Sequence, residues 1–478
     1  MARLAEGTLS RLQDARLGLS RSLDCPSHPF PEKVSIIMEL KKDAISLNSV
    51  IVYSISAAAP AMCIGGSMGF IMGGVGLAVP LAFLIATVVV VLISASYSQL
   101  SERYNSAGGT YSYIRRVFGP EMGWWVGWIY IGITFTVGCV GAIFAIYLCS
   151  LFTPIPLWLG IVIIAIPTFY VGWKGIQLTT KGLVILWLVQ TVLMVWPAIA
   201  ACNSQVPSMP DIGKQIFAVS WIPSLGSKGL AMAVLLCIWS YVGFETPAYL
   251  GEEIKGGSKA VKIAIPVGSI AIGITYIVVT WLWVSSISPE NLAKISGSGT
   301  AISNYCTIIG DPLGRWLITI SVCMSCLACW FSFVTALPRM LYDMGRTRAL
   351  PKSFAKLNRH SAPSVGLIVT MALWIGAALF GAYYSVDTLF SLMSSFACIA
   401  YALVCAAAIK DRWGGKGLKS FFIDKAIPFL AIGIMLWMLS SMSAGYLVAV
   451  GAWAVLGVLI IFFIKARKGK DFFKQVEL

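Results

Sequence analysis

Long apolar stretches alternate along this chain with short polar connections that are rich in lysine and arginine. A helix needs about 20 predominantly apolar residues to cross about 30 Å of hydrocarbon. Twelve stretches approach or exceed that length, namely 44–73, 76–101, 121–152, 156–173, 181–202, 228–251, 262–286, 315–341, 364–383, 387–409, 425–441 and 445–464. The pattern predicts an all-α polytopic membrane protein with about 12 transmembrane helices.

The amino-acid composition also indicates a membrane protein. Hydrophobic residues make up 58% of the chain and charged residues 12%, whereas a soluble domain carries about 25% charged residues. The net charge of +15 reflects an uneven distribution along the chain, because all but four of the 35 lysines and arginines fall in alternate connections or at the termini. Since basic residues accumulate on the cytoplasmic side, we expect both termini there, in a plasma or bacterial inner membrane.

The distribution of basic residues also indicates which molecules the protein binds. The basic residues are explained by topology, so we expect no nucleic-acid binding, and a basic inner face should attract anionic membrane lipid. The residues before the first span contain no apolar signal-peptide core, and we expect an uncleaved cytoplasmic segment. The oligomeric state is left open.

Two predicted spans are interrupted near their middles. The first contains Pro60 and Gly65, and the sixth contains Gly243 and Pro247 on either side of Glu245. Proline removes a backbone donor and glycine weakens a helix. These spans are the first of two successive sets of five, and transporters built from inverted repeats place broken helices at such matched positions. We therefore predict unwound segments in both spans.

Glu245 is the only acidic residue that falls well inside a predicted span. A carboxylate in hydrocarbon is costly unless it has a partner or a task, so this position predicts a transport site. The ends of broken helices expose backbone groups that bind substrate. The candidate substrate-binding residues are Ser56, Ala59, Pro60, Ala61, Gly65, Trp239, Tyr241, Gly243 and Glu245.

The predicted spans contain no cluster of residues that could form a catalytic or metal site. The two histidines, His28 and His360, fall in predicted cytoplasmic segments. Cys323, Cys326 and Cys329 repeat a C-x-x-C spacing, but helical spacing without a nearby histidine fits a packing stripe better than a metal site. We expect no enzyme activity, no cofactor and no metal.

Three ordered motifs resemble those of amino acid–polyamine–organocation (APC) permeases. They are residues 108–120 (GGTYSYIRRVFGP), residues 239–245 (WSYVGFE) and residues 338–342 (PRMLY). The resemblance covers about residues 44 to 465. It implies a LeuT-like fold of two inverted five-helix repeats plus two extra helices, with the substrate between the broken first and sixth helices.

The resemblance also implies roles for single residues. Trp239 matches an aromatic residue placed over the substrate, and Glu245 matches a carboxylate implicated in proton coupling. Gln190 matches the position of a coupling lysine in some members, which a neutral amide does not replace. Another departure is the sequence Ala57 to Ala61, which lacks the family's glycine-rich turn and weakens the expectation of α-carboxylate recognition.

These repeats imply the following organisation. Residues 1–43 form a cytoplasmic N-terminal segment, 44–202 the first repeat, 203–411 the second repeat, 412–466 the two extra helices and 467–478 a cytoplasmic tail.

The leading hypothesis is a proton-coupled secondary transporter that moves an amino acid or a small amine by alternating access, as a symporter or an antiporter. Glu245 would be protonated during part of the cycle, since burial disfavours the charged form. Alternatively, Glu245 is a permanent counter-charge for a cationic amine or polyamine in an exchanger. A third hypothesis, from another class, is a non-transporting receptor or accessory subunit. The substrate, the coupling ion and the direction of flux are left open.

Overall fold

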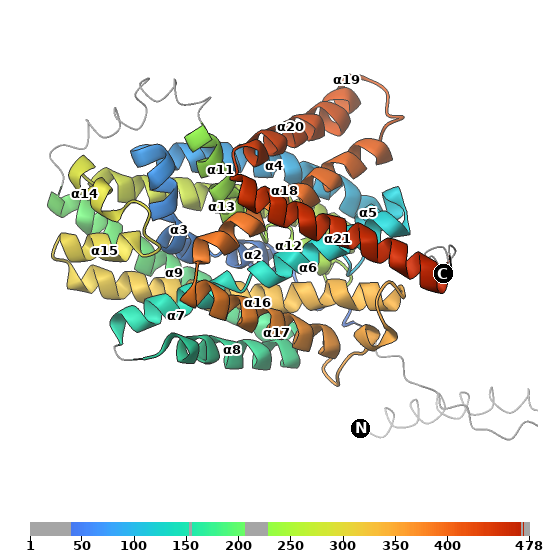
Figure 1. Cartoon of the computed structure of the whole chain (residues 1–478), viewed down its shortest axis with the longest axis horizontal. Coiled ribbons are helices and arrows are strands. Elements are labelled where there is room, and N and C mark those ends of the chain that lie inside the picture. Colours follow the sequence, from blue (N-terminus) through green and yellow to red (C-terminus); the bar gives the residue numbers. More distant parts are fainter. Residues whose placement is uncertain (1–39, 153–154, 206–227, 470–471, 473–478) are drawn as a thin grey trace, which may run out of the picture. The chain divides into compact units, whose positions relative to one another are not determined.

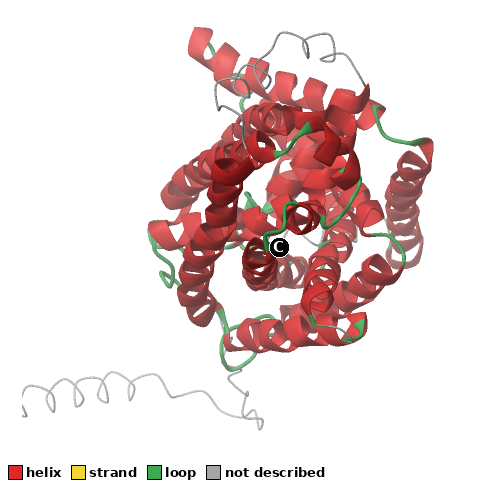
Figure 2. Ribbon diagram, turned by 90° about the vertical axis from the view of Figure 1, so that its left-hand side faces the viewer, coloured by secondary structure: helices red, strands yellow, loops and turns green. Residues whose placement is uncertain are grey.

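The computed structural model describes residues 40–152, 155–205, 228–469 and 472, and the statements below concern these residues. Helices provide almost all of the regular structure in these ranges (Figures 1 and 2). In chain order they are α2 (Leu47–Ala58), α3 (Pro60–Val75), η1 (Gly76–Ala78), α4 (Val79–Arg103), α5 (Thr110–Phe118), α6 (Pro120–Thr136), α7 (Cys139–Leu151), α8 (Leu157–Lys174), α9 (Ile176–Gln205), α11 (Lys228–Tyr241), α12 (Thr246–Tyr249), α13 (Gly257–Ser286), α14 (Pro289–Ile295), α15 (Ala301–Ile308), α16 (Pro312–Arg346), η3 (Lys352–Ala355), α17 (Ser364–Tyr383), α18 (Val386–Asp411), α19 (Leu418–Ser420), η4 (Phe421–Ala426), α20 (Ile427–Ser440) and α21 (Ala444–Lys468).

The long helices agree with the predicted spans. Within the described ranges, 11 helical runs are long and apolar enough to cross a membrane, and the run Leu47–Arg103 has 57 residues. At 1.5 Å per residue that run would be about 85 Å long, so it holds two crossings. These are the broken helix α2–α3 and the helix α4, which brings the number of spans to the predicted twelve.

The pattern of apolar residues missed an interruption in the third span. Helix α6 ends at Thr136 and α7 begins at Cys139. Gly138, between them, lies so close to α17 that an added Cβ would stand 2.5 Å from Ala377 Cβ and 2.6 Å from the Trp374 carbonyl oxygen. The short connecting helices α5, α14 and α15 were also missed, because none is long enough to register as an apolar span.

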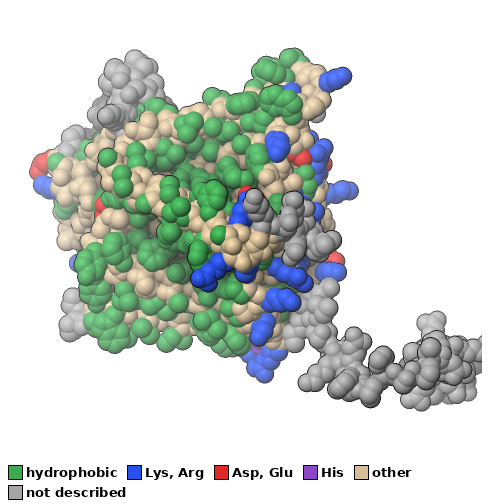
Figure 3. All heavy atoms as spheres, turned by 45° about the vertical axis from the view of Figure 1, so that its right-hand side comes forward, with side chains coloured by type: hydrophobic (Ala, Val, Ile, Leu, Met, Phe, Trp, Pro, Cys, Tyr) green, Lys and Arg blue, Asp and Glu red, His purple; other side chains and the backbone are tan. Residues whose placement is uncertain are grey.

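Exposed apolar side chains mark the faces that meet lipid. On α20 and α21, Leu436, Val448 and Phe462 are 59%, 69% and 64% exposed. Figure 3 shows apolar side chains over the flank of the bundle and lysines and arginines gathered at one end. We call this end, where α4, α16, α18 and α21 finish and α13 begins, the basic end.

Ion pairs join the helices at the basic end. Arg103 at the end of α4 lies 3.1 Å from Asp411 at the end of α18, and Lys465 of α21 lies 2.6 Å from Glu121 of α6. The predicted cytoplasmic position of this end remains a prediction, as do the repeat boundaries. Most of the predicted N-terminal segment, 1–43, lies outside the described residues, as do 206–227 and most of the tail 467–478.

One ion pair at the basic end is fully buried. The side chains of Arg339, in α16, and Glu253, in the loop after α12, are 3% and 2% exposed. Arg339 Nη2 donates to Glu253 Oε1 at 3.1 Å, and Arg339 Nε contacts Oε2. The Glu253 carbonyl accepts hydrogen bonds from the amides of Ala44 and Ile45 at 2.8 and 3.0 Å. The chain entering α2 is therefore tied to the loop leaving α12.

We expect Arg339→Gln to destabilise the protein by about 3–5 kcal/mol, because it leaves the Glu253 carboxylate buried without a cation. The measurement is thermal unfolding of the purified protein in detergent. The double variant Arg339→Met/Glu253→Met should be more stable than either single variant. Lys294→Gln, in an exposed pair with Glu290, is the control and should leave the unfolding midpoint almost unchanged. Losses that simply add in the double variant would contradict this account of the pair.

Candidate substrate site

The first predicted break is present between α2 and α3. Helix α2 ends at Ala58, and Ala59 adopts left-handed backbone angles, φ 45° and ψ 64°. Pro60 then occupies the first position of α3, where its missing N–H costs no helical hydrogen bond. The first-turn amides of α3, including those of Ala61 and Met62, have no acceptor within the helix and carry its positive dipole end.

The second break lies between α11 and α12. Helix α11 ends at Tyr241, and α12 begins only at Thr246. Gly243 has φ 111°, and an added Cβ there would stand 2.6 Å from Ala57 Cβ and 2.9 Å from Phe333 Cζ. Glycine is required here for both reasons, the backbone angle and the close approach of α2 and α16.

Side chains of neighbouring helices bond the carbonyl groups released at the two breaks. The Tyr276 hydroxyl of α13 lies 2.6 Å from the Ala58 carbonyl oxygen and 2.7 Å from that of Ser240. The Cys329 thiol of α16 donates to the Ala57 carbonyl at 3.1 Å. The Val242 carbonyl accepts no hydrogen bond from the described residues. It is therefore a free acceptor within the second break.

Glu245 lies in the second break and is 2% exposed. Its Oε2 accepts a hydrogen bond from the Gly243 amide at 2.9 Å, and its Oε1 accepts one from the Tyr130 hydroxyl of α6 at 3.4 Å. No lysine or arginine in the described part of the chain forms an ion pair with Glu245. A buried carboxylate without a cation favours protonation or a cationic ligand.

A cluster of hydroxyl groups surrounds Glu245. Thr110, at the start of α5, lies 2.7 Å from the Tyr97 hydroxyl, 3.0 Å from that of Tyr130 and 3.1 Å from that of Tyr249. The Tyr401 hydroxyl of α18 is also buried and faces Glu245. These hydroxyls can each donate or accept, so the cluster accommodates either charge state of the carboxyl.

The aromatic candidates point in different directions. The Trp239 ring packs on Phe390 of α18, with ring centroids 4.0 Å apart. The Tyr241 hydroxyl lies 2.6 Å from the Thr87 hydroxyl of α4, so this side chain turns toward α4 while its backbone stays at the break.

The other candidates lie along the two half-helices. Ser56, Ala59 and Ala61 are 0 to 2% exposed, and the Gly65 carbonyl accepts a hydrogen bond from the Tyr147 hydroxyl at 2.7 Å. The structure thus gathers Ser56, Ala59, Pro60, Ala61, Gly243 and Glu245 around the breaks. In this conformation the breaks are closed to solvent.

Gln190 is placed elsewhere. Its backbone carbonyl accepts a hydrogen bond from Ser321 of α16 at 2.7 Å. Ser321 precedes Cys329, which contacts the α2 break, by eight residues of α16, or about 12 Å. The side-chain amide of Gln190 is buried and makes no hydrogen bond to a described residue. A coupling role for Gln190 therefore remains a prediction, at a distance from the break.

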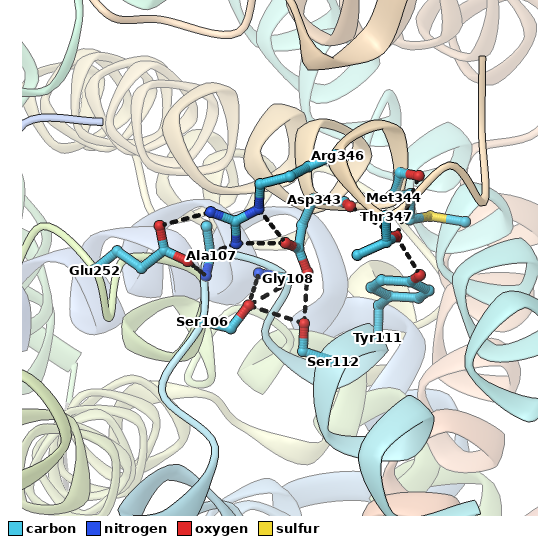
Figure 4. Close-up of polar contacts among 10 residues, drawn as sticks. All are labelled: Ser106, Ala107, Gly108, Tyr111, Ser112, Glu252, Asp343, Met344, Arg346 and Thr347. Carbon is cyan, nitrogen blue, oxygen red and sulfur yellow. Dashed lines mark hydrogen bonds and ion pairs between the residues drawn. The ribbon is translucent and has the colours of Figure 1, made fainter. Parts of the chain in front are cut away.

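A polar network closes the basic end next to the site (Figure 4). Arg346, at the end of α16, bridges Asp343 and Glu252 at 2.6 and 2.7 Å. Burial acts to raise the pKa of Glu252, but hydrogen bonds from Arg346 and the Ala107 amide, with the guanidinium charge, lower it overall. Glu252 therefore stays charged, and the bridge is lost only when the pH falls below the usual carboxyl range.

This network gives a physical reason for the glycines in the motif at 108–120. An added Cβ on Gly108 would stand 2.1 Å from Asp343 Oδ2, and one on Gly109 would stand 2.5 Å from the Tyr249 ring. Ser112 donates to the same Asp343 oxygen at 2.6 Å. The start of α5 thus fits between the network at the basic end and the hydroxyl cluster at Glu245. The individual residues were missed from the sequence, although the motif marked the segment.

Comparison with known proteins decides the family. A model of the amino acid permease family matches residues 44–468. The chain belongs to the amino acid permease family. The permease is therefore an integral, multi-pass membrane transporter and not an enzyme, as predicted.

Curated relatives of the permease carry different cargoes. The arginine/agmatine antiporter of Chlamydia abortus is 23% identical, over 85% of this chain and 87% of that protein. The branched-chain amino acid permease of Lactococcus lactis subsp. cremoris is 24% identical, over 83% and 88%. The methylthioribose transporter of Bacillus subtilis is 21% identical, over 83% and 87%.

A solved structure confirms the predicted fold of the permease. MhsT in complex with L-phenylalanine matches with a TM-score of 0.63, covering 84% of this chain and 99% of that chain at 13% identity. This match confirms the LeuT-like architecture, and the family model confirms the APC resemblance.

Replacing Gly243 with Ala in the permease should abolish transport, because the new Cβ would strain the backbone and strike Ala57 and Phe333. The matched control is Gly376→Ala in α17, where no atom of the described residues lies within 4 Å of the added Cβ. The measurement is substrate uptake into proteoliposomes, with folding checked by gel filtration. Normal uptake by a folded Gly243→Ala variant would contradict the tight geometry of the second break.

Proposed function

We propose that the permease binds an amino acid or small amine between the α2–α3 break and the α11–α12 break, and that Glu245 couples transport to a proton. The observation that carries the proposal is a buried carboxyl without a basic partner among the described residues, two positions from a glycine that contacts α2. Alternating access would then expose the breaks to each side of the membrane in turn.

Backbone groups at the breaks can hold the charged ends of an amino acid. The first-turn amides of α3, at Ala61 and Met62, would meet a carboxylate through the positive end of the helix dipole. The Val242 carbonyl would accept from the ammonium. An amine without a carboxylate would use only the second of these groups, which keeps both substrate classes open.

Glu245 has partners suited to both of its charge states. When ionised, it accepts hydrogen bonds from the Gly243 amide and Tyr130. When protonated, it can donate to a neighbouring hydroxyl, and burial favours this neutral form. A coupling group must change its charge during the cycle, and these surroundings allow the change.

The position of the carboxyl favours proton coupling over a permanent counter-charge. Glu245 bonds with its own turn and with α6, while Gly243 faces Ala57 on α2. A cationic substrate is also a candidate for this chain, because one relative is an arginine/agmatine antiporter.

We also propose that the basic end faces the cytoplasm, in accord with the distribution of lysine and arginine.

We expect Glu245→Gln to retain substrate counterflow and to lose accumulation driven by a pH gradient, because the amide resembles the protonated carboxyl but cannot release a proton. Both quantities are measured in proteoliposomes with radiolabelled amino acids and amines. Glu290→Gln, at an exposed site in α14, removes the same charge and should behave like the parent.

Two other outcomes for the Glu245→Gln variant would contradict proton coupling by Glu245. If Glu245→Gln binds a cationic amine much more weakly than the parent, Glu245 is a counter-charge. If both affinity and gradient-driven uptake are unchanged, Glu245 has neither role. Binding without any uptake by the parent protein would instead favour a receptor.

A further inference from the structure

A pocket of about 670 Å³ opens at the basic end, away from the two breaks. Helix α4 contributes one wall, α13 another, and the segment from the end of α18 to η4 the third. The polar lining residues that bear on its chemistry are Gln99, Glu102, Lys262, Arg412, Lys416 and Asp424. The transport site uses none of them.

The rim of this pocket carries more positive than negative charge. Three cations, Lys262, Arg412 and Lys416, face two carboxylates, Glu102 and Asp424. Lys262 and Arg412 hold Glu102 at 3.1 and 3.0 Å, which fixes their head groups at the rim. Lys416 makes no ion pair with any residue the structure describes, so it is available to an anion.

Two buried polar atoms in the pocket lining lack partners. Gln99 is 7% exposed, and its Nε2 donates to the Ile423 carbonyl at 3.1 Å. Its Oε1 accepts no hydrogen bond from the described residues, and Arg412 Nε likewise has no acceptor. A buried polar group without a partner costs about 1–3 kcal/mol, so a ligand that supplies both an anionic oxygen and a hydroxyl would bind favourably.

Apolar stripes continue from the pocket toward the middle of the bundle. On α4, Val88 and Leu84 are 51% and 44% exposed and follow Val91 and Ala95 at helical spacing. On α13, Ile270 and Ile274 are 46% and 58% exposed and follow Lys262 and Pro266 at intervals of four residues. A charged rim joined to exposed apolar stripes matches a molecule with a polar head and hydrocarbon tails.

We propose that this pocket binds an anionic glycerophospholipid, with the phosphate at Lys262, Arg412 and Lys416 and a headgroup hydroxyl donating to Gln99 Oε1. The acyl chains lie along the exposed stripes of α4 and α13. Phosphatidylglycerol has both the phosphate and the hydroxyl, whereas phosphatidic acid lacks the headgroup hydroxyl and phosphatidylcholine lacks net charge.

The test uses the full-length protein in detergent and measures lipid binding by native mass spectrometry and thermal shift. We expect one phosphatidylglycerol to bind about tenfold or more tightly than phosphatidylcholine. The double variant Lys262→Gln/Lys416→Gln should lower the affinity for phosphatidylglycerol by about fivefold for each lysine replaced. Lys425→Gln is the matched control, because Lys425 stacks over Trp413 and does not line the pocket. It should change binding by less than about twofold.

Gln99→Met tests the headgroup hydroxyl. It should lower the affinity for phosphatidylglycerol and leave the affinity for phosphatidic acid, which has no glycerol headgroup, unchanged. Free glycerol 1-phosphate at millimolar concentration should give no thermal shift, because it lacks acyl chains. Equal binding of phosphatidylglycerol and phosphatidylcholine, or equal weakening by Lys425→Gln and the double variant, would overturn the proposal. A shift with glycerol 1-phosphate as large as with the lipid would overturn the lipid assignment.

Discussion

Backbone that leaves helical geometry inside a membrane must find other hydrogen-bond partners, and the structure is arranged around this constraint. Without water, each unpaired amide or carbonyl in the bundle costs several kcal/mol. The single hydroxyl hydrogen of Tyr276 is shared between the carbonyl oxygens of Ala58 and Ser240, one from each break, so this side chain joins the two broken helices through α13. Cys329 bonds Ala57 from α16. Groups left free after these contacts are the ones available to a substrate.

The ends of the broken helices are also tied together. The Glu253 carbonyl, after α12, accepts from the amides before α2, and Arg339 holds the Glu253 side chain. The Arg346 network then connects the same loop to the start of α5. A movement that opens the basic end would therefore carry the entry to α2 and the exit from α12 together, and it would disturb the hydroxyl cluster that contacts Glu245. This arrangement connects a local charge change to the closure of the bundle.

The sequence was sufficient for the spans, for both breaks and for the unusual position of Glu245. Their signals are local: a run of apolar residues, Pro60 after a run of alanines, and Gly243 beside a lone carboxyl. The hydroxyl cluster was not predictable, because Tyr97, Thr110, Tyr130 and Tyr249 come from separate segments and look like ordinary membrane tyrosines and threonines. Their meeting depends on tertiary packing.

The predicted coupling role of Gln190 stays a prediction. Counting residues along a span placed Gln190 in α9 but did not give its height relative to the break, because that height depends on how α9 packs on α16. The contact with Ser321 sets it about 12 Å along α16 from Cys329. The lipid pocket likewise had no signal beyond a general excess of basic residues.

The central claim is that substrate binds to backbone groups at the two breaks. The most direct test is a cryo-electron microscopy structure of the protein with an amino acid or amine chosen by thermal-shift screening. The account predicts ligand density between the first turn of α3 and the Val242 carbonyl, with the ammonium at Val242 and any carboxylate at the amides of Ala61 and Met62. Ligand density elsewhere in the bundle, with both breaks unoccupied, would contradict it.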